Sequence, residues 1–255
     1  MVEKPDAEPK PLTSEIRFEE GDFHALSERL AGDRQYDDAR LMTRRKLGTL
    51  GKQAVERLAQ GGLEFVSRTS LHTPNSFNGM RVKRIWTYLV RSKAEKTRLK
   101  RTLGADLAKD LDAAYRNAYL CLAIEADALE VSLRLHPEAW YDGQNLVNRT
   151  RREGLDGWLA ELNRLDGFYL KMHDWKGEWR LGSLDRSALK EFLSFYKPGE
   201  HRLSVERRWP VPPGARGAAL GPEAPLELLD QLHRLASLYR FTAWSEHSDF
   251  LFSGS

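Results

Sequence analysis

The fold is decided by the stretch YLCLAIEADALEVSLRLH, which runs from Tyr119 to His136. Two apolar runs, 119–125 and 129–136, flank the short polar connection 126–128. Such a pair of runs is typical of an antiparallel hairpin. In the second run leucine and valine alternate with polar residues, so we expect one face of that strand to enter a core and the other to carry polar side chains.

Outward from this hairpin the same signals predict an alternation of helices and strands. Capping residues, leucine spacing and glycine stops predict helices over residues 22–30, 37–58, 93–111, 150–166, 185–193 and 226–238. The helix at 150–166 rests on the capping box Thr150-Arg-Arg-Glu153. Further strands are expected at 63–69, 84–90, 168–172, 178–181 and 202–209. The last of these alternates like an edge strand.

The pattern predicts an α+β protein in which helices pack on a largely antiparallel sheet. The chain has 255 residues, of which 41% are hydrophobic and 30% are charged, and no linker divides it. We therefore expect a single domain over residues 14–255. Residues 1–13 are predicted to form a disordered arm, and the Pro/Gly-rich segment 210–225 is predicted to be a surface loop.

The strongest functional signal is a block of charge between Arg81 and Arg101, which holds nine cationic side chains and one acid. The whole chain carries a net charge of only +3. On a helix Lys93, Lys96 and Lys100 are expected to form a solvent-facing stripe. The predicted binding residues are Arg84, Trp86, Arg91, Lys93, Lys96, Arg98, Lys100 and Arg101.

This block favours a binding or accessory protein that holds nucleic acid or an acidic protein. Arg84, Trp86 and Tyr88 share one strand face, and cations beside aromatic rings are typical of surfaces that bind single strands. Cations of the second helix would enlarge the patch if that helix packs nearby; they are Arg40, Arg44, Arg45, Lys46 and Lys52. Alternatively, the lysines only keep a helix solvated and the aromatic residues belong to the core.

A second hypothesis is an enzyme that acts on an anionic small molecule. Glu130, Ser132, Arg134 and His136 share the polar face of the predicted strand, and such groups can bind an anion or move a proton. The candidate pocket consists of His72, Asn75, Glu130, Arg134 and His136. In the alternative interpretation, the charges of a half-exposed strand pair with those of its neighbour. A nuclease-type metal site at Asp127 and Glu130 is disfavoured, because Ser132 stands where that type carries a lysine.

A third hypothesis is a structural subunit of a larger assembly. The aromatic residues near the C-terminus would supply its docking surface; they are Tyr239, Phe241, Trp244, Phe250 and Phe252. The charge block is a property of the sequence itself, whereas the pocket and the docking surface both depend on an assumed fold. The residues therefore favour a non-catalytic binding protein over the other two classes.

The sequence contains no signal for a metal site, a cofactor site or a reactive cysteine. The seven histidines lack the spacing of a zinc site, so no metal and no cofactor is assigned. The single cysteine, Cys121, lies in an apolar run and is expected to be a buried thiol. No signal peptide or membrane span is recognisable, which predicts a cytoplasmic protein.

The order of elements resembles that of two uncharacterised bacterial α+β families, the DUF1054 (YktB-like) and DUF2461 groups. The resemblance covers residues 18–200 and includes a loop with His72, Pro74 and Asn75 that leads to an aromatic strand at Trp86. The chain lacks the His-Ala-Arg-Arg and Asn-Pro-Pro-Asn pattern of the first group, and the basic helix after Val90 looks like an insertion. The resemblance implies a fold and carries no catalytic residue to this chain.

Overall fold

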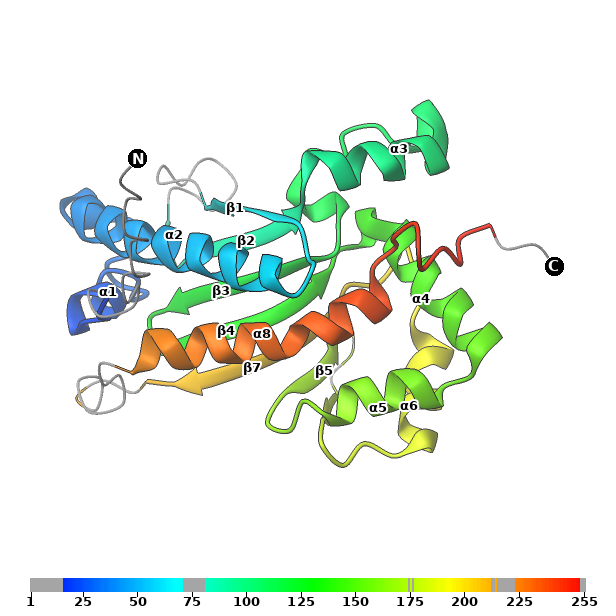
Figure 1. The fold of residues 1–255 in the computed structure, drawn as a ribbon. Helices are drawn as coiled ribbons and strands as arrows, with labels where there is room; N and C mark the ends of the chain where they lie inside the picture. The colour runs from blue at the N-terminus through cyan, green and yellow to red at the C-terminus, as the bar shows by residue number, and fades with distance from the viewer. Residues whose placement is uncertain are drawn as a thin grey trace, which may run out of the picture.

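The predicted hairpin lies near the centre of a seven-stranded sheet (Figure 1). The computed structural model describes residues 16–70, 81–173, 175, 177–211, 214 and 223–252. Its strands are β1 (Phe65–Thr69), β2 (Arg84–Arg91), β3 (Tyr119–Glu125), β4 (Ala128–Leu135), β5 (Tyr169–Met172), β6 (Glu178–Arg180) and β7 (Leu203–Pro210). They follow the order β1-β2-β3-β4-β7-β5-β6, and each neighbouring pair is antiparallel.

The helices are α1 (Glu20–His24), α2 (Asp37–Gln60), α3 (Lys93–Leu107), α4 (Trp140–Glu153), α5 (Asp156–Asn163), α6 (Arg186–Phe195) and α8 (Ala224–Thr242). Short 3₁₀ turns lie at Arg34–Tyr36, Ala114–Arg116 and Pro137–Ala139. Figure 1 shows α2 and α8 side by side across one face of the sheet. The prediction of a single α+β domain with a largely antiparallel sheet is confirmed.

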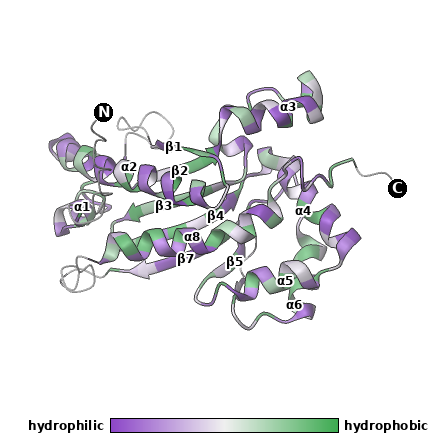
Figure 2. Ribbon diagram, in the orientation of Figure 1, coloured by the Kyte–Doolittle hydropathy of each residue, from purple (hydrophilic) through white to green (hydrophobic). Residues whose placement is uncertain are grey.

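Alternation along the strands places the core between the sheet and these helices. Leu129, Val131 and Leu133 are buried in one hydrophobic cluster together with Leu232 and Leu235 of α8. In Figure 2 apolar and polar residues alternate along α8, as expected for a helix with one buried face.

Close approach between α2 and the sheet depends on a glycine. A Cβ atom at Gly51 would lie 2.5 Å from the Thr87 hydroxyl oxygen and 3.2 Å from the Ser67 Cβ. Any larger residue would therefore push the helix away from β1 and β2.

A buried ion pair joins segments that are far apart in the chain. Arg91, the last residue of β2, donates to the carboxylate of Asp142 in the first turn of α4, and the two side chains are 3% and 0% exposed. The same carboxylate accepts from the backbone amides of Ala118 (2.7 Å) and Trp244 (2.8 Å), and Arg91 also donates to the Trp244 carbonyl (2.9 Å). This pair fixes the ends of β2, β3, α4 and α8 to one another.

Three local predictions are wrong. Thr150 does not open a helix, because α4 continues to Glu153 and the next helix begins at Asp156. The Thr150 hydroxyl instead donates to the Val147 carbonyl within α4 (2.9 Å). The first helix ends at His24, short of the expected boundary.

The third error concerns β7, which is not an edge strand along its first half. It pairs with β4 over its whole length, and Leu203–Glu206 also pair with β5. Alternation of apolar and polar residues indicates that a strand has one buried face and one polar face. It does not indicate whether the strand lies at the edge or in the interior of the sheet. The predicted arm at 1–13 lies outside the described residues, as does most of the loop at 210–225.

None of the helices in the described part of the chain combines the length and the apolar character that a membrane span requires.

We expect Asp142→Asn to lower the free energy of unfolding by about 3 to 5 kcal/mol, because it leaves the Arg91 guanidinium buried without its counter-charge. Urea denaturation followed by circular dichroism measures this loss. The control is Asp106→Asn, which breaks an exposed pair between Asp106, near the end of α3, and Lys109, just beyond the helix. This control is expected to change stability by less than about 0.5 kcal/mol. Equal, small effects of both substitutions would show that the buried pair does not hold the fold together.

Candidate functional site

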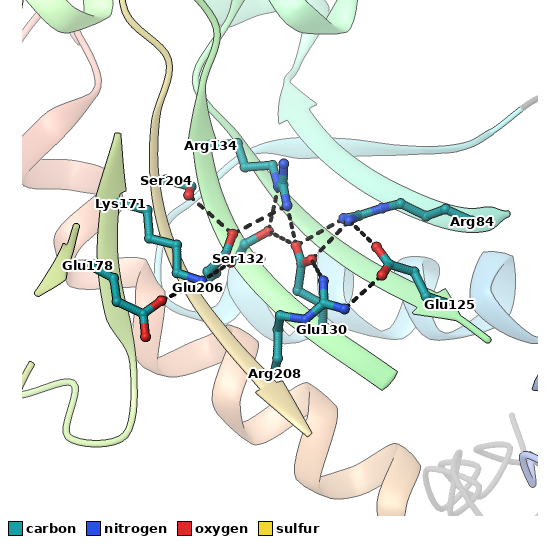
Figure 3. Close-up of polar contacts among 10 residues, drawn as sticks. All are labelled: Arg84, Glu125, Glu130, Ser132, Arg134, Lys171, Glu178, Ser204, Glu206 and Arg208. Carbon is teal, nitrogen blue, oxygen red and sulfur yellow. Dashed lines mark hydrogen bonds and ion pairs between the residues drawn. The ribbon is translucent and has the colours of Figure 1, made fainter. Parts of the chain in front are cut away.

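The face of the sheet opposite α8 carries a continuous polar network (Figure 3). Its side chains are Arg84, Glu125, Glu130, Ser132, Arg134, Lys171, Glu178, Ser204, Glu206 and Arg208. They lie on one face because of the strand register. On β4 and β7, for example, Glu130 stands opposite Arg208 and Ser132 stands opposite Glu206.

Glu130 is the centre of this network, and its side chain is 2% exposed. It accepts hydrogen bonds from Arg84 (2.9 Å for each of two bonds), Arg134 (2.6 Å) and the Ser132 hydroxyl (2.7 Å), and a longer one from Arg208 (3.4 Å). Burial alone would raise the pKa of the Glu130 carboxyl. The charges of Arg134 and Arg84 outweigh burial and lower the pKa to about 2.

The remaining acids of the network are also paired. Glu206 accepts from Lys171 (3.0 Å) and from the Ser204 hydroxyl (3.1 Å). Glu125 bridges Arg84 and Arg208, each at 2.7 Å, and Glu178 pairs with Lys171 at 2.9 Å. Four cations and four acids therefore neutralise one another across the face, and no carboxylate is left over as a base.

The candidate catalytic pocket is only partly assembled. Glu130 and Arg134 are in direct contact. His136 follows the end of β4, and six residues of extended chain put it about 20 Å from Glu130, beyond hydrogen-bond reach. Its Nδ1 atom accepts from the Glu138 amide (3.2 Å), and its ring contacts Tyr115. His72 and Asn75 lie outside the described residues.

Most of the basic block between residues 81 and 101 is neutralised by the fold. Six of its nine cations have acidic partners, several from distant parts of the chain. The partners are Glu28 for Arg81 and Lys83, Glu125 and Glu130 for Arg84, Asp142 for Arg91, Asp112 for Lys96, and Glu95 with Glu246 for Arg98. Lys93, Lys100 and Arg101 are exposed and have no ion-pair partner among the described residues.

The predicted solvent-facing stripe is therefore wrong at Lys96, whose side chain is 6% exposed. Lys96 precedes Leu99 by three residues and Leu103 by seven, so it lies on the buried leucine side of α3. Burial lowers the pKa of the Lys96 ammonium, although the hydrogen bond to Asp112 opposes this; the nearby charges of Arg68 and Lys100 lower the pKa further. Arg91 is likewise buried and is not part of a binding surface.

A cationic groove lies elsewhere, along the edge of the sheet between α2 and β1. This α2–β1 groove has a volume of 440 Å³ and is lined by Arg44, Arg45, Gly48, Thr49, Lys52, Ser67, Arg68 and Thr69. Among these described residues four are cationic and none is acidic. Arg44 is held by hydrogen bonds to the Thr69 hydroxyl (2.9 Å) and the Ser70 carbonyl (2.7 Å).

From the sequence, the cations of the second helix are expected to enlarge the basic patch only if that helix packs nearby. Arg44, Arg45 and Lys52 do lie beside β1. Arg40 is buried against the Ala25 and Leu30 carbonyls, and Lys46 pairs with Asp22, so neither enlarges the patch. Arg68 was missed because it stands alone in its strand, outside any run of charge.

The C-terminal aromatic residues do not form the predicted docking surface. Tyr239 and Phe241 are buried on the inner side of α8, which continues to Thr242. Trp244 follows the helix and is also buried, with its backbone held by Asp142 and Arg91. Phe252 is 59% exposed. Cys121 is buried as expected, and burial raises the pKa of its thiol.

Comparison with known proteins gives no family for this chain, since no protein-family model and no curated protein matches it. Within the described residues no group of three or more His, Cys, Asp or Glu side chains is placed to hold a metal ion.

We expect Glu130→Gln to destabilise the fold by about 3 kcal/mol at neutral pH, because it leaves three guanidinium groups around a neutral side chain. The folded-state pKa of Glu130, about 2, lies below its ordinary value of 4.5. The carboxylate therefore stabilises the fold above pH 4.5, and this contribution is lost as the pH falls from 4.5 toward 2. Urea unfolding of both proteins at a series of pH values measures the difference, which should narrow toward low pH.

The matched control is Glu178→Gln, which removes a half-exposed acid at the end of the same network. It is expected to cost less than about 1 kcal/mol. A difference between wild type and Glu130→Gln that stays constant from neutral to acid pH would contradict the role assigned to the Glu130 charge.

Proposed function

We propose that this protein is a non-catalytic nucleic-acid-binding protein that contacts phosphate groups in the α2–β1 groove. The observation that carries the proposal is the composition of the groove, which brings Arg44, Arg45, Lys52 and Arg68 together without an acid among the described lining residues. Such a surface attracts a polyanion, because each phosphate contact releases condensed counterions. The hydroxyls of Ser67 and Thr69 add short-range donors for phosphate oxygens.

The contact surface extends from the groove toward α3 and β2. Arg68 stands opposite Tyr88 in the β1–β2 register, and Tyr88 and Trp86 are half-buried on the same face of β2. Lys100 is exposed on α3, and the charge of Arg68 contributes to lowering the pKa of Lys96 on the same helix. Cations beside partly exposed aromatic rings favour a single strand, whose bases can stack while its phosphates are held.

The polar network of the sheet gives less support to an acid–base enzyme. A general base works best when its pKa lies near the operating pH, whereas the pKa of Glu130 is about 2. Its neighbours Ser132 and Arg134 are engaged in the same hydrogen bonds. Holding the strands together accounts for all of these contacts.

The double substitution Lys52→Glu/Arg68→Glu tests the proposal. With four groove cations, the logarithm of the wild-type affinity for a single-stranded oligonucleotide should fall with the logarithm of salt concentration at a slope of about −3. The double variant should bind much more weakly, and its slope should be shallower by about one for each cation removed. Fluorescence anisotropy across a NaCl series gives both quantities.

Two controls separate the groove from general charge effects. Lys190→Glu makes half of the charge change of the double variant at an exposed site on α6, which packs beside β6 at the other end of the sheet, and should leave binding nearly unchanged. Lys83→Glu alters a member of the basic block that is already paired with Glu28, and its effect should also be small. Absence of wild-type binding at the lowest salt, or equal losses in all variants, would overturn the proposal.

A further inference from the structure

A second, chemically different cavity lies where β1, α3 and the C-terminal end of α8 meet. Its volume is 550 Å³, within the range of small-molecule sites. The walls include Phe65 of β1, Glu95 and Arg98 of α3, and the chain from Tyr239 to Ser248. Among the described residues, this α8 cavity shares no lining residue with the α2–β1 groove.

Two residues that line the α8 cavity carry buried polar atoms with no hydrogen-bond partner among the described residues. They are the Tyr239 hydroxyl and the Trp244 indole Nε1, on side chains whose residues are 6% and 2% exposed. Buried donors are rarely left unsatisfied in proteins, because each loses its hydrogen bonds to water. An indole N–H can only donate, so Trp244 requires an acceptor. Burial raises the pKa of Tyr239 to about 12, so its hydroxyl also remains a donor at neutral pH.

Donors are in excess around the cavity. The three acids of the lining, Glu64, Glu95 and Glu161, already accept from the Ser92 hydroxyl, Arg98 and Arg164 respectively. Arg149 and Arg240 add guanidinium groups to the lining, of which Arg149 also pairs with Glu153 (2.8 Å) and Arg240 also donates to the Gly61 carbonyl. The guanidinium carbon of Arg149 lies 3.9 Å from the centre of the Phe241 ring. Phe65 and Phe241 supply apolar surface. This combination suits a ligand with a negative, acceptor-rich end and an apolar body.

The wall that carries Trp244 is held in place without a ligand. The backbone of Trp244 is fixed by Asp142 and Arg91. The chain beyond it is tied to α4, since Asn145 accepts from the Phe250 amide (2.8 Å) and Asn148 donates to the Phe250 carbonyl (2.8 Å). A preformed cavity costs little ordering on binding.

We infer that the α8 cavity binds a small aromatic carboxylate, with the carboxylate accepting from Tyr239 and Trp244 and the ring lying against Phe65 and Phe241. This inference is independent of the proposed nucleic-acid surface. The double variant Lys52→Glu/Arg68→Glu should therefore retain the ligand.

Benzoate and indole-3-acetate are suitable probes, with neutral benzyl alcohol as the comparison. The seven tryptophans give separate indole N–H signals in a ¹H–¹⁵N spectrum, and Trp244→Phe identifies the one that belongs to Trp244. We expect this signal to move downfield and to saturate as a carboxylate probe is added, while benzyl alcohol has a much weaker effect. No saturable movement with either carboxylate would overturn the inference.

Tyr239→Phe separates a ligand site from a cavity that holds only water. Removing an unpartnered hydroxyl should leave the melting temperature unchanged or raise it, and should weaken benzoate binding roughly tenfold or more. Tyr115→Phe removes the same atom from an exposed tyrosine outside the cavity and should bind normally. A lowered melting temperature in Tyr239→Phe with unchanged benzoate affinity would assign the hydroxyl to a structural water and would also overturn the inference.

Discussion

The polar face of the sheet depends on the buried carboxylate of Glu130. On the face of the sheet opposite α8, Glu130, Ser132 and Glu206 are buried, so the polar residues of β2, β4 and β7 must satisfy one another. Glu130 does this by accepting from Arg84, Arg134 and Arg208, and thereby joins those strands through side chains as well as through backbone hydrogen bonds. A charge buried in this way is stable only while all its partners are in place. The network is therefore best understood as part of the fold.

Pairing of charges by the fold also explains why the basic block at residues 81–101 does not predict which part of the surface is cationic. A count along the sequence treats each cation as free, whereas the fold brings acids to six of the nine from Glu28, Asp112, Asp142 and other distant positions. The α2–β1 groove arises in the opposite way. Its cations come from two separate elements, and no acid among the described residues accompanies them. Surface charge is thus a property of the packing, and a local excess in the sequence does not survive folding.

Sequence patterns predicted what depends on local periodicity. The alternation in β4 gave the hairpin and the polar face, and the leucines of α3 gave the helix. Strand order could not be predicted, because β7 enters the sheet between β4 and β5 through contacts that no local pattern encodes. The error at Lys96 has a different origin. The spacing to Leu99 and Leu103 already placed this lysine on the buried side, but the length of a lysine side chain lets its ammonium reach Asp112 from there.

The buried polar groups of the sheet face and those of the α8 cavity differ in whether their hydrogen bonds are satisfied. On the polar face Arg134 donates to Glu130, Ser132 and Glu206. These acceptors are themselves bonded to other members of the network, so the set of interactions is closed. In the α8 cavity the Tyr239 hydroxyl and the Trp244 indole face the reverse situation, since the neighbouring acid Glu95 is already taken by Arg98. A closed network gains nothing from a further partner, whereas an unsatisfied donor gains a hydrogen bond from any acceptor that reaches it. The unsatisfied donors therefore distinguish the α8 cavity from the polar face of the sheet, where the hydrogen bonds serve the fold.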